Sequence, residues 1–452
     1  MGKLFGTDGI RGVVNAGLNA DLAYKVGLAA AIVLAKDKKP GEKPLVTIGK
    51  DTRISGDLLK GSLISGLCTA GADVLDLGTL PTPGVAWVTV EEGADAGIVI
   101  SASHNPFEYN GIKIFNGEGF KLSDELEEKI EDIVLFAGRS VPMKTRGEIG
   151  RVRYVAIKAS EDYIDHLEDS IDSTLGGLRV LVDCANGAAS ATASRLFGRF
   201  SKLRADVINA NPDGVNINDR CGSTHLDALS AMVKAGGYDI GLAFDGDADR
   251  CLAVDELGSL IDGDQIMAAC GMDMKAKGQL PKNTVVATVM SNLGFHVYAR
   301  ENGMKLECTD VGDRNVLERM VEKRYRLGGE QSGHMIFLEH ATTGDGQLTA
   351  LQMLALMKES GKKASEVFGS CPRYPQVLIN IPVADNDVKK AVMASPLLAQ
   401  AVRREEEALS GGGRVLVRPS GTEALMRVMV EAKTLELAQE TAQRLAGLIP
   451  QL

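Results

Sequence analysis

The sequence lacks the features that mark membrane proteins and disulfide-rich proteins. It has no window of about 18 consecutive apolar residues, so a membrane-spanning helix is excluded. Its seven cysteines are widely spaced and form no C-x-x-C pair, which argues against a zinc knuckle or a disulfide framework. The N-terminus has no basic segment followed by an apolar one. These absences predict a protein of the reducing cytoplasm.

The chain also lacks an excess of positive charge. Its 50 lysines and arginines face 60 aspartates and glutamates, which gives a net charge of −10. Nothing in this total attracts a polyanion, so neither nucleic acid nor a membrane surface is an expected partner. If the substrate carries phosphate, a few local arginine and lysine side chains must attract it.

The sequence does contain a repeated alternation of strand and helix patterns. Its 452 residues exceed the size of a single core. Apolar, β-branched runs alternate with helical spacing, and this rhythm restarts near residues 178 and 251. The pattern predicts an α/β fold of three similar α/β domains with mixed sheets and a smaller C-terminal α+β domain. The predicted domains are residues 1–152, 153–252, 253–368 and 369–452, with a polar linker near 144–153.

The first stretch that carries chemistry contains two serines directly after an apolar run that ends at Ile100. Its sequence is Ser101-Ala102-Ser103-His104-Asn105-Pro106. Pro106 fixes its own φ and moves Asn105 out of the helical region, so the chain is expected to turn sharply at the end of a strand. Open α/β sheets place their chemistry there. A serine-containing turn without a catalytic role explains the same residues.

The second stretch is acidic. Asp245, Asp247 and Asp249 follow an apolar run at alternate positions. Carboxylates this close raise one another's pKa unless a cation compensates, and ligands that are all oxygen suit a hard ion such as Mg²⁺. A calcium-binding EF-hand is disfavoured, because Arg250 stands where that loop needs glycine and the flanks are typical of strands. A solvated acidic turn is the structural alternative.

Together the two stretches give a hypothesis about phosphoryl transfer. A three-carboxylate site with open positions binds its ion to a phosphate oxygen as well, and Ser103 supplies that oxygen if it carries a phosphoryl group. Positioned basic groups would stabilise the charge on the transferred group. His104 is not expected to be a base for Ser103, because successive side chains point apart on an extended chain.

A third stretch has polar side chains at alternate positions. In an extended segment, Glu330, Ser332 and His334 would share one face and could hydrogen-bond the vicinal hydroxyls of a sugar. An ordinary polar turn explains these residues about as well.

A fourth stretch resembles an anion-binding loop. Arg418 ends a predicted strand, and Ser420, Gly421 and Thr422 follow. The guanidinium offers a planar fork to phosphate, and loop amides and hydroxyls can complete the nest. The Walker lysine spacing is absent, so nucleotide hydrolysis is not expected.

Five motifs in this order resemble the α-D-phosphohexomutase superfamily over essentially the whole chain. They are FGTDGIRG at 5–12, SASHNP with NGIKIF at 101–115, DGDADR at 245–250, GGEQSGH at 328–334 and RPSGTE at 418–423. The chain is most similar to the branch of bacterial phosphoglucosamine mutases. The features of that branch are the opening motif, NINDRCGSTH at 216–225, Gln331 and TTGDG at 342–346. The resemblance implies four domains around a central cleft.

The resemblance also implies roles for individual residues. Ser103 would be the phosphorylated serine, and one Mg²⁺ per chain would be held by Ser103, Asp245, Asp247 and Asp249. The sugar would be held by Glu330, Ser332 and His334. The distal phosphate would be clamped by Arg418, Ser420, Gly421 and Thr422. The transfer site would be lined by Arg11, His104, Lys113 and Arg250, with Lys113 helping to move the hydroxyl proton.

The activity implied by the resemblance is reversible conversion of glucosamine 6-phosphate to glucosamine 1-phosphate. It would run through a phosphoserine enzyme and a 1,6-bisphosphate and would feed UDP-N-acetylglucosamine synthesis. The alternative is a phosphomannomutase or phosphoglucomutase on the same scaffold. Two other classes stay open, a non-catalytic protein that binds sugar phosphate or calcium and a simple phosphatase.

Two positions depart from the family pattern. Asp310 stands where a basic residue is usual, so it receives no role. Ala424 replaces a usual proline after Thr-Glu, which would loosen the phosphate loop without removing its ligands. Relatives of this branch are often dimeric, so the resemblance adds a homodimer as an expectation, although no exposed apolar stripe in the sequence argues for it.

Overall fold

The computed structural model describes residues 4–451 except 7, 37, 40, 137–142 and 421–423. The chain divides into two compact units. The first is Met1–Met290 with Met304–Ser370, and the second is Ser291–Gly303 with Cys371–Leu452. Across the described residues, no helix is both long and apolar enough to cross a membrane.

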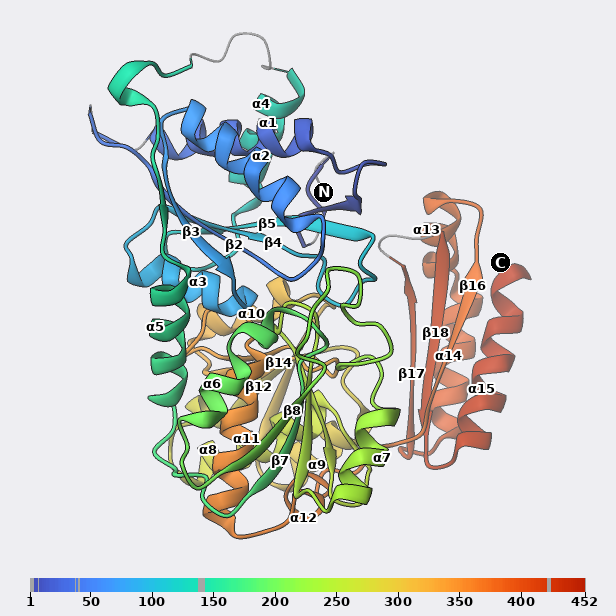
Figure 1. The fold of residues 1–452 in the computed structure, drawn as a ribbon. Coiled ribbons are helices and arrows are strands. Elements are labelled where there is room, and N and C mark those ends of the chain that lie inside the picture. Colours follow the sequence, from blue (N-terminus) through green and yellow to red (C-terminus); the bar gives the residue numbers. More distant parts are fainter. Residues whose placement is uncertain are drawn as a thin grey trace. The chain divides into compact units, whose positions relative to one another are not determined.

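The first sheet of the first unit has six strands in the order β1–β5–β4–β2–β3–β6 (Figure 1). The strands are β1 (Ile10–Val13), β2 (Leu45–Lys50), β3 (Asp73–Thr79), β4 (Ala96–Ile100), β5 (Tyr109–Asn116) and β6 (Val152–Tyr154). Since β6 pairs with β3, the end of the stretch predicted as a linker is the edge of this sheet. The helices here are α1 (Ala20–Ala35), α2 (Gly56–Thr69), α3 (Thr82–Glu91), α4 (Asp124–Phe136) and α5 (Ala156–Glu168).

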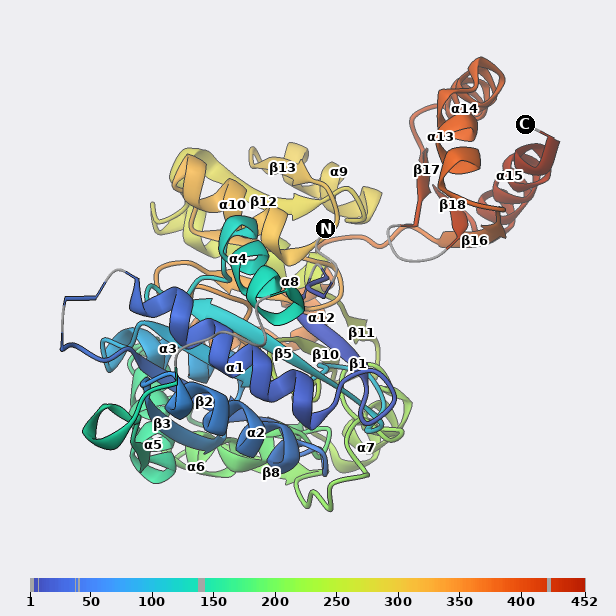
Figure 2. The same cartoon turned by 90° about the horizontal axis from the view of Figure 1, so that it is seen from above.

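Helices α1 and α2 pack side by side over the first sheet (Figure 2). Their close approach depends on two glycines. A Cβ atom on Gly66 would lie 2.1 Å from the carbonyl oxygen of Tyr24, and one on Gly27 would lie 2.3 Å from that of Leu63. Val26 and Leu63 from the two helices and Ile48 from β2 are fully buried in the shared core. Small residues at the crossing therefore let the larger ones reach the sheet.

The second sheet has the order β11–β10–β9–β7–β8. Its strands are β7 (Arg179–Asp183), β8 (Arg204–Ile208), β9 (Ile240–Phe244), β10 (Cys251–Asp255) and β11 (Leu260–Ile261), with helices α6 (Ala193–Gly198) and α7 (Asp227–Gly236). All five residues of β10 pair antiparallel with β9. The boundary predicted between residues 252 and 253 thus falls inside a strand of the second sheet, which continues to Ile261.

The third sheet has the order β13–β12–β14–β15. Its strands are β12 (Thr284–Thr288), β13 (Lys305–Thr309), β14 (Leu327–Gly329) and β15 (Met335–Phe337). The helices in this part of the first unit are α8 (Gly263–Ala276), α10 (Asp313–Lys323), α11 (Gly346–Ser360) and α12 (Ala364–Phe368). Short 3₁₀ turns in the chain are Arg146–Glu148, Ala188–Ala191, Pro281–Asn283 and Ile449–Gln451.

The three sheets share one four-strand order, which is the kinship that the sequence pattern alone suggested. The order is β3–β2–β4–β5 in the first sheet, β8–β7–β9–β10 in the second and β13–β12–β14–β15 in the third. In each sheet the first three strands are parallel and the fourth is antiparallel to the third. The loop between the third and fourth strands therefore occupies an equivalent place in all three.

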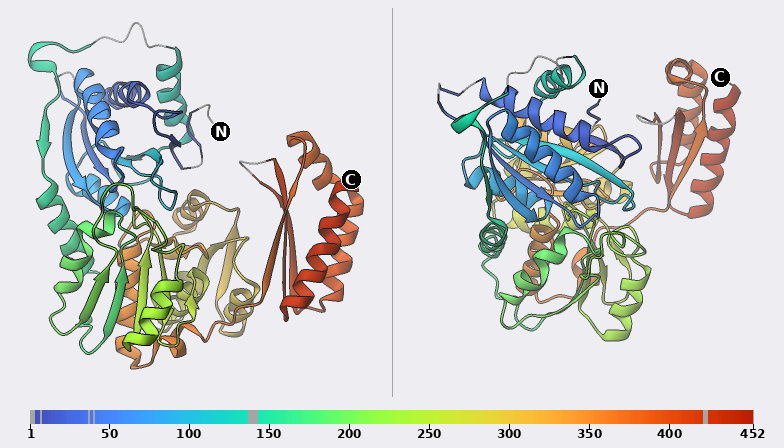
Figure 3. Two further views of the ribbon diagram at one scale, coloured as in Figure 1. Left: turned by 45° about the vertical axis from the view of Figure 1, so that its right-hand side comes forward. Right: turned by 45° about the horizontal axis from the view of Figure 1, so that its top comes forward.

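The second unit is a smaller α+β domain. Its strands β16 (Gln376–Pro382), β17 (Gly413–Pro419) and β18 (Leu425–Ala432) form an antiparallel sheet in the order β16–β18–β17. Helices α13 (Asn386–Ala394), α14 (Pro396–Ala408) and α15 (Leu435–Leu448) belong to it, and α14 and α15 cover one face (Figure 3). The predicted fold class, three α/β domains with mixed sheets and a smaller C-terminal α+β domain, is confirmed.

One segment of the second unit comes from the middle of the chain. Helix α9 (Leu293–Glu301) is held by Glu431, which is fully buried. This carboxylate accepts hydrogen bonds from Asn292 Nδ2 at 3.1 Å and from the Leu293 amide at 2.9 Å, and it pairs with Arg414 at 3.0 Å. Residues 291–303 therefore pack with the C-terminal sheet, although the sequence pattern put them in the third domain.

Candidate active site

The three loops that the sequence singled out in the first unit are the equivalent loops of the three sheets. Residues 101–108 join β4 to β5, residues 245–250 join β9 to β10, and residues 330–334 join β14 to β15. The loops also touch. The first meets the second through Ser103 and Asp245, and the second meets the third through a β-bridge between Arg250 and His334. Repetition of one topology thus brings together residues more than 200 positions apart.

Ser103 is buried and has an unusual backbone conformation. Its φ is +52°, in the left-handed region that non-glycine residues rarely adopt. Its amide donates to Ser101 Oγ at 2.9 Å, and its own Oγ donates to Asp245 Oδ2 at 2.6 Å. The serine hydroxyl therefore faces the acidic loop, as the hypothesis requires.

His104 lies beside Ser103, which corrects the sequence argument. Its Nδ1 is 3.3 Å from Ser103 Oγ. The expectation that the two side chains point apart assumed an extended chain, but the left-handed φ of Ser103 brings them to the same side. Burial, together with the charges of Arg250 and Arg11, lowers the pKa of His104 to about 4, so the imidazole is neutral near pH 7.

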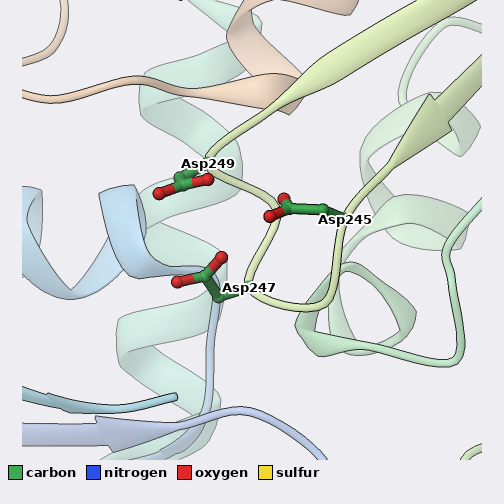
Figure 4. A group of neighbouring side chains, drawn as sticks. All are labelled: Asp245, Asp247 and Asp249. Carbon is green, nitrogen blue, oxygen red and sulfur yellow. The ribbon is translucent and has the colours of Figure 1, made fainter. Parts of the chain in front are cut away.

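The side chains of Asp245, Asp247 and Asp249 converge on one space (Figure 4). One oxygen from each lies within 4.8 Å of the others, and the three residues are buried, being 0, 1 and 5% exposed. This burial rules out the alternative of a solvated acidic turn. The flanking elements are strands β9 and β10, as the argument against an EF-hand expected.

Two of the three carboxylates have a buried oxygen that accepts no hydrogen bond within the described part of the chain. Asp247 Oδ2 accepts from Thr82 Oγ1 at 2.7 Å and from Lys113 Nζ at 3.0 Å. Asp249 Oδ2 faces Lys113 and His334 at 3.7 and 3.6 Å. The Oδ1 atoms of Asp247 and Asp249 are buried and accept no hydrogen bond from a described residue. Arg250 Nε lies 3.7 Å from Asp249 Oδ1. Buried oxygens without a hydrogen bond, in three carboxylates that converge within 4.8 Å, fit a hard divalent cation.

The surroundings shift the pKa values of two of these carboxyl groups in opposite directions. Burial, and then the charges of Asp249 and Asp247, raise the pKa of Asp245 well above its ordinary value. Burial opposes ionisation of Asp249 as well, but Lys113, His334 and Arg250 together outweigh it and hold the pKa of Asp249 low. A cation bound among the three would remove the repulsion that Asp245 bears. The residues present therefore fit a metal site.

Lys113 contacts the cluster directly and connects it to Arg11 through Asp8, an aspartate that the sequence pattern did not single out. Lys113 Nζ lies 3.2 Å from Asp8 Oδ2, and Asp8 also pairs with Arg11. Burial opposes the charge of Lys113, yet the carboxylates of Asp247, Asp8 and Asp249 raise its pKa above the ordinary value. Lys121 then links Asp8 to Asp313 of α10, at 2.6 Å from each carboxylate. No periodic pattern marks Lys121 or Asp313.

The third loop is a turn and not the extended segment on which the shared face of Glu330, Ser332 and His334 depended. The Gly333 amide donates to the carbonyl of Glu330 at 3.0 Å, because β14 and β15 form a tight hairpin. His334 is buried between Asp249 and Asp313, with the Gly344 amide donating to its Nε2 at 3.1 Å. Glu330 accepts from the Gly312 amide at 3.2 Å, and Ser332 is half-buried.

The second unit contains the start of the predicted phosphate loop. Arg418 is the cross-strand partner of Arg427, and burial and this neighbouring charge lower the pKa of Arg418. Like charges placed opposite each other on neighbouring strands repel, so an anion between them would be stabilising. Buried Lys389 donates to the carbonyl of Ser420 at 2.9 Å. Gly421 and Thr422 lie outside the described residues. Arg427 and Lys389 escaped the sequence analysis, although the strand register would have pointed to Arg427.

A serine that donates to a buried carboxylate, beside a buried lysine and half-buried arginines on repeated α/β sheets, fits phosphoryl transfer. The fold and the related proteins define an isomerase-type phosphotransferase that acts on hexose phosphates. Four protein-family models of phosphoglucomutase/phosphomannomutase domains match the sequence in chain order. Alpha/beta/alpha domains I, II and III cover residues 2–137, 161–258 and 262–374, and the C-terminal domain covers residues 378–448. The chain belongs to the phosphoglucomutase/phosphomannomutase family.

Relatives with known names agree over the full length. A curated phosphoglucosamine mutase of Desulforamulus reducens is 51% identical over 451 residues, which is 99% of each chain. A phosphoglucomutase/phosphomannomutase family protein of Burkholderia thailandensis has a TM-score of 0.79 at 24% identity, covering 99% of this chain and 97% of that one. The N-acetylphosphoglucosamine mutase of Aspergillus fumigatus, solved with GlcNAc-6P and magnesium, has a TM-score of 0.70 at 19% identity and covers 99 and 95%. Because both solved structures are less than 25% identical to this chain, they show that the fold is shared and no more.

Proposed function

We propose that this chain is a phosphoglucosamine mutase, which interconverts glucosamine 6-phosphate and glucosamine 1-phosphate through the 1,6-bisphosphate. Its product would feed the synthesis of UDP-N-acetylglucosamine. The observation that carries the proposal is identity of 51% over essentially the full chain to proteins of that name. The 2.6 Å contact between Ser103 and Asp245 supports the same chemistry.

Ser103 is the proposed carrier of the phosphoryl group. In the forward direction, the bond between phosphorus and Ser103 Oγ breaks while a bond forms to the 1-hydroxyl oxygen of glucosamine 6-phosphate. The hydroxyl proton leaves. The bisphosphate then returns its 6-phosphoryl group to Ser103 Oγ, and the sugar 6-oxygen takes up a proton as its bond to phosphorus breaks. A Mg²⁺ ion held by Asp245, Asp247, Asp249 and the Ser103 phosphate would neutralise charge on the transferred group. The two orphaned oxygens of Asp247 and Asp249 support this ligand set.

Lys113 acts, in this proposal, as a fixed cation and not as the proton acceptor. Three carboxylates lie within 3.7 Å of its Nζ, which favours the ammonium form. Arg11 and Arg250 add positive charge beside the transferred group. The hydroxyl proton then passes to an imidazole. The site offers His104, whose pKa burial and nearby arginines lower, and His334, whose pKa Asp249 and Asp313 raise despite burial. The kcat values of His104→Gln and His334→Gln decide which imidazole is needed.

The remaining predicted residues bind the sugar phosphate. Glu330, Ser332 and His334 would hold the sugar hydroxyls. Arg418, Ser420, Gly421 and Thr422 would clamp the distal phosphate, and the register of β17 and β18 adds Arg427 to that set. One clamp must accept either phosphate of the bisphosphate, since the sugar has to react at both ends.

The proposal also includes the domain divisions, the cellular location and the oligomeric state. Four working domains are proposed, with divisions near residues 154, 261 and 370, which respect the ends of β6, β11 and α12. A cytoplasmic location is proposed from the sequence, whose seven cysteines are widely spaced and form no C-x-x-C pair. A homodimer is kept as a proposal for measurement by light scattering.

The deciding experiment is an assay of the full chain against the 6-phosphates of glucosamine, glucose and mannose. The protein should first be brought to the phosphorylated state and checked by intact mass. Turnover highest for the glucosamine compound, with a phosphate adduct on Ser103, is expected. Equal or faster turnover of the glucose or mannose compound would contradict the substrate. Release of inorganic phosphate without isomer would indicate a phosphatase, and absence of an adduct would favour a non-catalytic binding protein.

A further inference from the structure

The motif NINDRCGSTH at 216–225 distinguishes the chain within its family, but the proposed chemistry assigns it no role. Asn218 within it is buried, with 7% of its surface exposed. Its Nδ2 donates to the carbonyl oxygen of Ser103 at 3.0 Å and to that of Asn105 at 3.1 Å. Because both neighbours are acceptors, only the amide nitrogen can satisfy them. A side chain of the second sheet's domain thus binds the backbone of the serine loop.

A second buried side chain binds the same two carbonyls. Arg53 Nη2 donates to Ser103 O at 3.0 Å and to Asn105 O at 2.7 Å. Its Nη1 donates to Asp51 Oδ2 at 3.3 Å, which balances its charge. Asp51 in turn accepts from Ser101 Oγ at 2.7 Å, and Ser101 Oγ accepts from the Ser103 amide. The amide and the carbonyl of Ser103 are therefore both held by side chains.

The conformation that these bonds hold is one the chain would not keep unaided. Ser103 has its φ at +52°, and strained backbone of this kind persists only where the surroundings fix it. The acidic loop packs against the other side of the Ser103 carbonyl. A Cβ atom on Gly246 would lie 2.5 Å from Ser103 O and 2.9 Å from Asn218 Nδ2. The carbonyl of Ser103 is thus enclosed by Arg53, Asn218 and Gly246.

We propose that Asn218, together with Arg53, is a positioning clamp for the phosphoserine loop. The inference rests on the proposed function, because it concerns how Ser103 serves as donor and acceptor in alternate steps. In both steps Oγ must stay in line with the substrate oxygen, and a displacement of about 1 Å costs on the order of 100-fold in rate. The clamp binds the carbonyls of Ser103 and Asn105 and leaves Oγ free to carry a phosphoryl group.

The test compares substitutions of Asn218 in the full-length enzyme. Asn218→Ala removes both bonds and is expected to lower kcat about 10- to 100-fold with KM changed less than about twofold. Asn218→Asp has nearly the shape of asparagine but turns a carboxylate toward two carbonyl oxygens, so its kcat should be lower still. If Asn218 merely fills space, Asn218→Asp would retain more activity than Asn218→Ala, which overturns the clamp. If Asn218→Asp does not fold, Asn218→Leu is measured in its place, because leucine keeps a similar volume but has no hydrogen-bond donor. A leucine variant more active than Asn218→Ala would then overturn the clamp.

A half-reaction separates this inference from the proposed function. Dephosphorylated enzyme is mixed with glucosamine 1,6-bisphosphate, and phosphate on Ser103 is followed by intact mass. Wild type should gain one phosphate quickly, and Asn218→Ala should gain it about 10- to 100-fold more slowly. The exposed neighbour Asp219 provides the matched control, and Asp219→Asn should behave as wild type. A wild type that takes no phosphate contradicts the proposed function, whereas equal rates in wild type and Asn218→Ala contradict only the clamp.

Discussion

Thr82 provides a quantitative test of how the carboxylate cluster is held. This residue begins α3, and its Oγ1 donates to Asp247 Oδ2 at 2.7 Å while its amide donates to the Asp247 carbonyl at 2.9 Å. Thr82→Val keeps the shape and the backbone bond and removes only the hydroxyl. A buried hydrogen bond to a charged group contributes about 1.5–3 kcal/mol, which corresponds to roughly 10- to 100-fold in an equilibrium. Loss of such a partner typically weakens metal binding by a similar factor, about 10- to 100-fold.

The assay is the Mg²⁺ concentration that gives half-maximal mutase activity, checked by direct calorimetric titration. Thr82→Val should raise it about 10- to 100-fold, and Thr82→Ser should stay near wild type because serine keeps the donor. Thr89 on the same helix is the matched control, because its buried Oγ1 lies 2.6 Å from Thr47 Oγ1 and away from the cluster. Thr89→Val should lower the melting temperature without shifting the Mg²⁺ midpoint. A folded Thr82→Val enzyme with the wild-type midpoint would refute the reasoning.

Three further predictions concern the serine, a buried acid and the second unit. Ser103→Ala should take no phosphate from glucosamine 1,6-bisphosphate by intact mass and lose mutase activity; a phosphate found on another residue would contradict this. Burial raises the pKa of Asp345 to about 6, so the folded protein keeps a proton that the unfolded chain releases, and stability falls as the pH rises from about 4 to 6. Urea unfolding should show this fall, about 2–3 kcal/mol, in wild type and not in Asp345→Asn, and parallel pH curves would count against it. Arg427→Gln should raise KM about tenfold for both sugar phosphates with kcat nearly unchanged, and a fall in kcat alone would speak against a binding role.

Local pattern was enough to predict most strands and the centre of the site. Asp245, Asp247 and Asp249 stand directly after β9, and the alternating spacing that sequence reveals is also what lets their oxygens converge. Ser103 follows β4 in the same way. In both cases the residues that form the pattern lie within a few positions of each other in the sequence, so the order of residue types was sufficient for the prediction.

The rest depends on contacts between distant residues or on a single torsion angle. Strand β10 belongs to the second sheet through its pairing with β9, which composition does not encode. His104 turns toward Ser103 because one φ is positive. Thr82 and Asn218 meet their partners across more than 100 positions of chain, and the residues next to them do not indicate those partners. Register and close packing decide these contacts, and both emerge only when the sheets are assembled.

The repeated strand order explains why the chemistry is divided as it is. Each sheet contributes the loop between its third and fourth strands, so a serine, an acidic cluster and a histidine occupy equivalent places. Buried hydrogen bonds from Thr82, Lys113 and Asn218 then join the domains of the first two sheets. Because Ser103 and the carboxylates are held in this way, they cannot move from one phosphate of the bound sugar to the other. In a reaction that uses both ends of a bisphosphate, the intermediate must therefore turn around while Ser103 and the carboxylates stay in place.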